Sequence, residues 1–273
     1  MKHSPALVVL TDFFAVSNRT LSYAAGLAVP LHAHLVLLHV RRDGLLAPAE
    51  YSHHTTSTER QTARQLQHLA AGQDVPTEVD ISEDFLPEAV EDVVRRHHPL
   101  LLVLGRPGSA TMPAEIVTNT AMDLLRHAPF PLLVVPTVSW DVRPPRRLLL
   151  AVDGQPFKLP ETHQLLSRLL RANQGTLDVV HVATEAAPDD APDVLAGIYP
   201  RGMLQEVEAH RVHHMQQPTV VGGVLQQAAD MEADMLVVVA RRHSLLGGLF
   251  HRSVTAQLIQ ESPVPVLVLP AEE

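Results

Sequence analysis

The sequence predicts two tandem α/β domains, each built on a doubly wound parallel sheet with helices on its faces. Three observations lead to this fold class. Short runs rich in Val and Leu alternate with stretches of helical period, and the same landmarks occur twice along the chain. The chain has 273 residues, which is about twice the roughly 100 to 150 that are most common for one domain.

The duplication is visible in paired segments of the two halves. "LVVLTD", ending at Asp12, corresponds to "LLLAVD", ending at Asp153, and "PLLLVLGRPG" corresponds to "DMLVVVARRH". "HAPFPLLVV" near the middle of the chain returns as "SPVPVLVL" near its end. The offset between paired positions stays between 134 and 142 residues, and a nearly constant offset indicates an internal duplication.

The elements of the first copy follow from two periodicities. The apolar runs within 7–12, 34–40 and 99–108 are short and do not alternate, as in parallel strands that are covered on both faces. Residues 17–31 and 86–98 carry apolar side chains at close to the 3.6-residue period and are expected to be helices. Strands that alternate with helices give the doubly wound sheet.

The second copy repeats this order after a linker. In "SWDVRPPRR", residues 139–147, two prolines interrupt regular structure. The predicted domains are therefore 1–140 and 146–273. Strands are expected again within 148–153, 177–182 and 234–243, where short apolar runs recur.

Composition excludes several classes of protein. The formal charge of -9, from 21 Lys and Arg against 30 Asp and Glu, argues against a nucleic acid partner, which requires a basic face. The longest apolar runs fall far short of the roughly 18 residues of a membrane span. The N-terminal apolar run is too short for a signal peptide, so a cytoplasmic location is expected. Without cysteine there is no disulfide and no thiolate metal site.

Both halves resemble universal stress protein domains, and the chain resembles a tandem member of that family. The resemblance is carried by Asp12 and Asp153, the "HV" pairs at His39 and His181, the "LVLGRPG" segment and the two proline-bounded endings. It implies five-stranded, Rossmann-like sheets of the adenine nucleotide alpha-hydrolase type, paired through their last strands as an intrachain pseudo-dimer. The family resemblance is also compatible with a homodimer of two such chains. The sequence does not identify a protein partner.

Many members of that family bind ATP with Gly, two residues, Gly, nine residues, then Gly and Ser or Thr. The first copy keeps Gly105 and Gly108, with Thr118 and Asn119 where the final pair is expected. Asn119 is expected to cap the helix that this pair opens. ATP or AMP is thus one expectation for domain 1, and a tight turn without ligand is the other. The candidate nucleotide-binding residues are Asp12, Val40, Gly105, Gly108, Thr118 and Asn119.

The second copy departs further from the pattern. Ala240 and His243 replace both glycines, and Arg252 precedes Ser253 where glycine is expected. Side chains at these positions would obstruct the approach of phosphate to the backbone. With Asp153, these residues form a degenerate site in which ATP binding is not expected.

No catalytic residue and no metal site are predicted. The sequence contains no Gly-Lys-Ser/Thr phosphate loop and no Gly-x-Ser-x-Gly elbow. His210, His213 and His214 have the spacing of one helix face, but no carboxylate or cysteine completes a ligand set, so a solvated face is expected. His39 and His181 are expected to form hydrogen bonds at strand ends.

These observations predict a non-catalytic stress-response module that binds or interacts with a partner. The alternative is an ATP- or AMP-binding sensor that uses only the crevice of domain 1. The sequence identifies neither the stress nor the partner.

Overall fold

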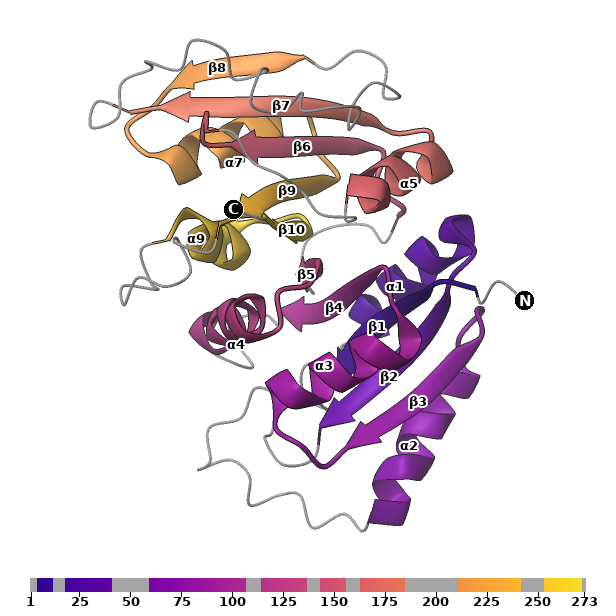
Figure 1. Ribbon diagram of the computed structural model, residues 1–273. Coiled ribbons are helices and arrows are strands. Elements are labelled where there is room, and N and C mark those ends of the chain that lie inside the picture. Colours follow the sequence, from indigo (N-terminus) through magenta and orange to yellow (C-terminus); the bar gives the residue numbers. More distant parts are fainter. Residues whose placement is uncertain are drawn as a thin grey trace. The chain divides into compact units, whose positions relative to one another are not determined.

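The computed structural model describes residues 4–11, 18–40, 59–106, 114–136, 143–155, 163–184, 211–241 and 253–271. The chain divides into two compact units, Met1–Arg143 and Pro144–Glu273. Each unit contains one parallel sheet and its own helices (Figure 1). No helix in the described part of the chain is long and apolar enough to cross a membrane.

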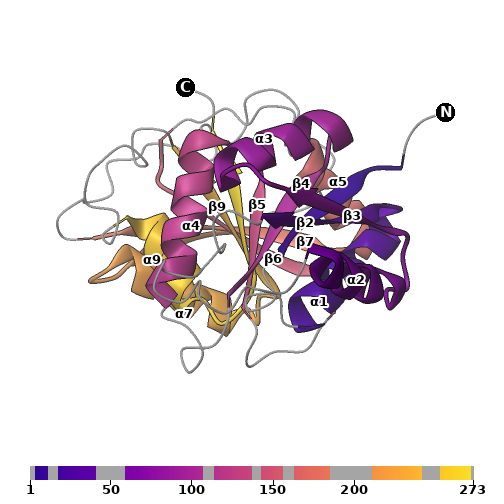
Figure 2. The same ribbon diagram turned by 90° about the horizontal axis from the view of Figure 1, so that it is seen from below.

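Unit 1 has the strand order β3-β2-β1-β4-β5, and every neighbouring pair is parallel. Right-handed crossovers in both directions from β1 place α1 and α2 on one face and α3 and α4 on the other (Figure 2). Its elements are β1 (Ala6–Thr11), α1 (Asn18–Leu31), β2 (His34–Val40), α2 (Glu59–Ala71), β3 (Thr77–Ser82), α3 (Leu86–His97), β4 (Leu101–Arg106), α4 (Ala114–His127) and β5 (Leu132–Pro136).

Unit 2 repeats the connectivity of unit 1 with the order β10-β9-β6-β7-β8, again parallel throughout. The predicted fold of two doubly wound, five-stranded α/β domains is therefore confirmed. The described elements are β6 (Arg147–Val152), α5 (His163–Asn173), β7 (Thr176–Ala183), β8 (Val212–Gln216), α7 (Val220–Asp230), β9 (Met235–Ala240), α9 (Val254–Glu261) and β10 (Val266–Pro270).

Burial explains why strands such as β1 and β10 read as unbroken apolar runs. Every residue of β1 and of β10 is buried, because helices cover both faces of a parallel sheet. β3 and β8 are half-buried to exposed along most of their length. These two strands accordingly carry His, Asp, Glu and Gln side chains, which a strand covered on both faces would exclude.

The helices show local signals for where they begin and end. Thr219 caps α7, and its Oγ1 accepts a hydrogen bond from the N–H of Gly222 at 3.1 Å. α3 begins with a proline in its first turn and ends with Arg95, Arg96 and His97, where positive charge complements the helix dipole. His98 then ends the helix in a left-handed conformation, with φ at 45°.

Candidate functional site

The strand order reverses between β1 and β4 in unit 1 and between β6 and β9 in unit 2. Doubly wound sheets bind ligands in the crevice at the carboxyl ends of the two strands where this reversal occurs. In unit 2, Asp153 follows β6 directly and Arg241 follows β9 directly. These two residues therefore project from the strands that border the crevice.

Asp153 and Arg241 form a bidentate ion pair across this crevice. Arg241 donates from Nε to Oδ2 of Asp153 at 2.8 Å and from Nη2 to Oδ1 at 2.9 Å. Nη2 also donates to the carbonyl oxygen of Gln155 at 2.7 Å. The Arg241 side chain is only 16% exposed, whereas that of Asp153 is 56% exposed. Two parallel, charge-assisted hydrogen bonds fix both groups more firmly than a single contact would.

A tight turn after β6 presents the groups that hold Arg241. The N–H of Gln155 donates to Oδ1 of Asp153 at 3.1 Å. Gly154 between them has φ of 76°, a left-handed conformation that glycine adopts without the steric cost of a side chain. The turn therefore directs both the Asp153 carboxylate and the Gln155 carbonyl to one guanidinium.

Opposing influences act on the pKa of the Asp153 carboxyl. Burial raises this pKa, but the hydrogen bonds from Arg241 and from the Gln155 N–H lower it by more, so that the net shift is downward. The carboxylate is thus anionic at neutral pH and is already engaged by a cation. A group in this state is a weak general base.

The other described residues of the predicted degenerate site are Ala240 and Ser253. Ala240 ends β9 and is buried. Ser253 is the N-cap of α9, and its Oγ accepts a hydrogen bond from the N–H of Ala256 at 3.0 Å. One of the helix N–H groups that could bind an anion is therefore satisfied by the protein itself.

In unit 1, Gly105 and Val40 lie at the carboxyl ends of their strands. Gly105 pairs with Val135 of β5, and Val40 is the buried last residue of β2. Arg106 follows Gly105, and burial lowers the pKa of its guanidinium. Predicted residues Asp12, Gly108, His243, Arg252 and His210 lie outside the described part of the chain.

The prediction that Thr118 and Asn119 open a helix is wrong. Both residues lie in the second turn of α4, which spans Ala114–His127. Thr118 is buried and Asn119 is exposed, so Asn119 does not cap the helix and neither residue offers an N-terminal anion site. Glu115 in the first turn favours this earlier start of the helix through the helix dipole.

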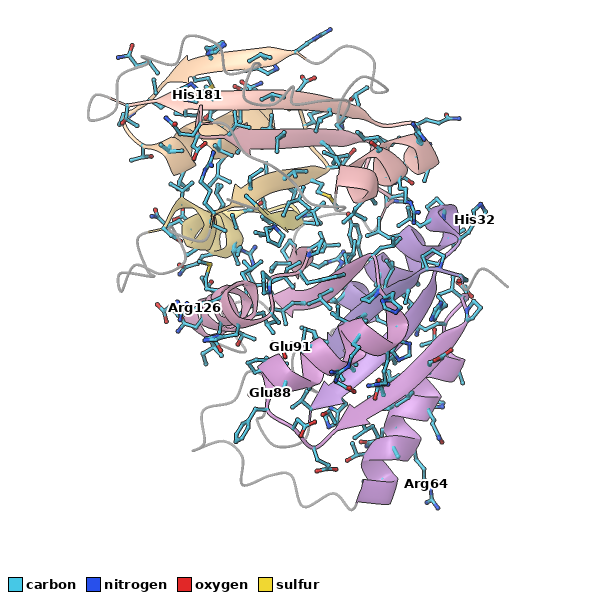
Figure 3. The ribbon with its side chains drawn as sticks, viewed as in Figure 1. His32, Arg64, Glu88, Glu91, Arg126 and His181 are labelled. Atoms are coloured by element: carbon cyan, nitrogen blue, oxygen red, sulfur yellow. The ribbon has the colours of Figure 1, made fainter. Side chains whose placement is uncertain are left out.

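The prediction of a helical face with His213 and His214 is also wrong, because both residues lie in β8. Successive side chains of a strand point to opposite faces. His213 Nε2 lies 3.1 Å from Oδ2 of Asp178, whereas the His214 ring meets His181 of β7 edge to face, with centroids 6.0 Å apart. Figure 3 shows His181 on β7. The two histidines therefore cannot share one ligand position.

The expectation for His39 agrees with the structure. Its Nδ1 lies 3.0 Å from the carbonyl oxygen of Thr11, which joins the ends of β1 and β2. With the proton on Nδ1, the ring donates this hydrogen bond, so the histidine forms a buried contact at the strand ends.

Arg241 is the residue of this candidate site that the sequence analysis missed. A signal for it existed, because an arginine occupies the corresponding position in both copies, as Arg106, the last residue of β4, and as Arg241, directly after β9. Each copy also places an aspartate after its first strand, at Asp12 and Asp153. Two such positions flank one crevice in a doubly wound sheet, so an ion pair between them could have been predicted.

Comparison with known proteins gives a consistent result. The family model of the universal stress protein family matches residues 5–136 and again residues 145–270. A universal stress protein from Archaeoglobus fulgidus DSM 4304 has a similar structure, with a TM-score of 0.67 and 15% identity over 98% of this chain and 97% of that one. A functionally unknown protein from Pseudomonas aeruginosa PAO1 is similar over 98% of this chain and 93% of its own, at a TM-score of 0.59 and 16% identity.

No match was found among curated proteins. The two structural relatives are too distant in sequence to show more than the fold, whereas the family model covers nearly the whole chain in two consecutive copies. The chain therefore belongs to the universal stress protein family, of which it contains two tandem domains.

Proposed function

We propose that the protein is a non-catalytic binding or interaction module in the stress response, and that its second unit does not bind nucleotide. The ion pair between Asp153 and Arg241 carries this proposal. In this pair the Asp153 carboxylate after β6 accepts two hydrogen bonds from the nearly buried Arg241 guanidinium after β9.

A nucleotide entering this crevice would have to compete with the ion pair. To bind the sugar or base of a nucleotide, Asp153 would have to release two charge-assisted hydrogen bonds from Arg241, which are stronger than bonds between neutral groups. The Arg241 side chain would then be left in a site where it is only 16% exposed. Separating a largely desolvated charge from its partner is costly.

The absence of catalysis is part of the same proposal. Asp153 has a lowered pKa and a fixed cationic partner, so it is poorly suited to accept a proton at neutral pH. His39, which borders the end of β1, uses Nδ1 to contact a backbone carbonyl.

The second candidate function is an ATP- or AMP-binding sensor that uses unit 1 alone. It is favoured by Gly105, because unit 1 retains glycine at the end of β4 where unit 2 has Ala240 at the end of β9. A glycine at this point allows the backbone to approach a phosphate closely.

Titration calorimetry of the intact chain with ATP, ADP and AMP in magnesium distinguishes these possibilities. The proposal predicts that Asp153→Ala leaves the nucleotide stoichiometry of the wild-type chain unchanged. Binding of one nucleotide that is lost in Asp12→Ala and kept in Asp153→Ala would support the sensor. Binding that is lost in Asp153→Ala would contradict the proposal for unit 2.

We also propose that the two units pair through their last strands, as the family resemblance suggests. β5 and β10 are the terminal strands of the two sheets and are apolar, and such strands are prone to aggregate unless they are covered or paired. Small-angle X-ray scattering should then give the radius of gyration of a compact chain, about 19 Å. A clearly larger value would indicate separated units.

A further inference from the structure

Three possible metal ligands come together at the opposite end of the unit 1 sheet from the crevice. They are His34, Glu78 and His97, and one ligand atom from each lies within 4.8 Å of the other two. His34 begins β2, Glu78 is near the start of β3, and His97 ends α3. The cluster is therefore separate from the residues that border the crevice.

Strand register brings the first two ligands to one face of the sheet. Glu78 pairs with Val36 of the parallel strand β2, and His34 lies two residues before Val36. Since residues two apart in a strand share a face, His34 and Glu78 are diagonal neighbours on the same side. The last turn of α3 places His97 on that side as well.

Polar neighbours restrain both imidazoles. Nδ1 of His34 lies 3.3 Å from Oγ of Ser4, and Nε2 of His97 lies 3.4 Å from Oδ2 of Asp80. The same Oδ2 of Asp80 forms an ion pair with Nη2 of Arg96 at 2.6 Å. Contacts of this kind, in which a carboxylate or hydroxyl group orients a histidine ring, are typical of the surroundings of metal ligands.

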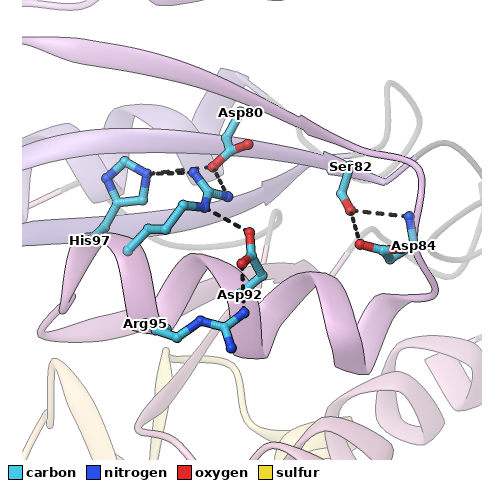
Figure 4. Close-up of polar contacts among 7 residues, drawn as sticks. Asp80, Ser82, Asp84, Asp92, Arg95 and His97 are labelled. Carbon is cyan, nitrogen blue, oxygen red and sulfur yellow. Dashed lines mark hydrogen bonds and ion pairs between the residues drawn. The ribbon is translucent and has the colours of Figure 1, made fainter.

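The cluster has a net negative charge from Glu78, although Nη1 of Arg96 also lies 3.3 Å from Nε2 of His97. Arg95 and Arg96 both contact Asp92, and Arg96 also contacts Asp80 (Figure 4). The two guanidinium charges therefore match the two aspartates, and the negative charge of Glu78 is outside this balance. Glu78 is exposed and both histidines are half-buried, so an ion can reach the three groups from solvent.

We propose that His34, Glu78 and His97 bind one zinc ion, with the fourth position open to water. Two imidazoles and one carboxylate form a known ligand set for Zn²⁺, with ligand distances of about 2.0 to 2.2 Å. Small side-chain movements bring groups that are already within 4.8 Å of one another to such distances. The bound ion joins β2, β3 and α3, and so it stabilises unit 1 by an amount that rises with the logarithm of the free zinc concentration divided by Kd.

Calorimetric titration of the EDTA-treated, dialysed intact chain with ZnCl₂ tests this proposal. We expect one Zn²⁺ per chain at about micromolar affinity or tighter. His34→Ala, His97→Ala and Glu78→Gln should each weaken that site by about tenfold or more, because each removes one of three protein ligands. Glutamine has the same shape as glutamate, and position 78 is exposed. A loss of zinc affinity in Glu78→Gln is therefore not explained by unfolding.

A matched control comes from α4, where Nδ1 of His127 lies 3.2 Å from Oδ1 of Asp123 on the helix surface. His127→Ala removes an exposed histidine beside a carboxylate and should leave the zinc affinity unchanged. The proposal is overturned if the tightest zinc site keeps its affinity in both Glu78→Gln and the double variant His34→Ala/His97→Ala. It is also overturned if the wild-type chain binds no zinc at micromolar concentration. Replacement by Co²⁺ gives a second readout, since its visible bands should disappear in the double variant.

Discussion

Replacing Asp153 with alanine is expected to destabilise unit 2 by about 2 kcal/mol, and asparagine at the same position should have roughly half that effect. Alanine removes both hydrogen bonds from Arg241 and the bond from the Gln155 N–H. Asparagine removes the charge but keeps an oxygen that can accept from Gln155. Both estimates are below the value for a fully buried pair, because solvent screens the 56% exposed carboxylate. Hydrogen exchange of the β6 and β9 amides measures the change.

The contribution of the ion pair to the free energy of unfolding should decrease as the pH falls. The pKa of Asp153 is lower in the folded chain than its ordinary value, so its contribution is complete above the unfolded pKa, at about 3.9. That contribution is lost as the pH falls through the folded pKa. The stability difference between wild type and Asp153→Asn should therefore be constant near neutral pH and shrink below about pH 4. A difference that grows on acidification would contradict the assignment.

Replacing Gly223 with alanine is expected to destabilise the chain by about 1 to 3 kcal/mol. Gly223 lies in α7 where the helix packs on β7, and an added Cβ would be 2.7 Å and 2.9 Å from the two methyl carbons of Val182. Valine is short and has few rotamers, so it cannot move aside. The helix would have to shift away from the sheet, and the urea midpoint of unfolding should fall.

Gly26 in α1 provides the matched control for this substitution. An added Cβ at Gly26 would meet nothing within 4 Å, and alanine favours a helix over glycine by about 0.5 to 1 kcal/mol. Gly26→Ala should therefore stabilise the chain, so the same chemical change has opposite signs in the two helices. Equal effects at both positions would show that propensity, and not the contact with Val182, determines the result.

The fold was predictable because its strongest signals are local and occur twice. Strands such as β1 and β10 are buried along their whole length and therefore read as unbroken Val and Leu runs. The repetition of each run in the second half of the chain supported every assignment. β8 could not be identified in this way, because it is only half-buried and its sequence, VHHMQ, also fits a helix.

The candidate site was less predictable because its contacts depend on tertiary structure. Thr118 and Asn119 were assigned from the spacing of a family motif, but α4 begins before them. Arg241 meets Asp153 only because β9 lies beside β6, although the two residues are 88 positions apart. His34, Glu78 and His97 are likewise distant in sequence and meet through strand register and the end of α3.

The most direct test of the central claim is an NMR titration of the intact chain with ATP and magnesium, observed at the Nε–H of Arg241 and the backbone N–H of Gln155. These two groups donate to the Asp153 carboxylate, so any ligand that takes this carboxylate must change their environment. The proposal predicts that both resonances stay in place at millimolar ATP. Saturable movement of both signals would show that nucleotide enters the crevice of unit 2 and would contradict it.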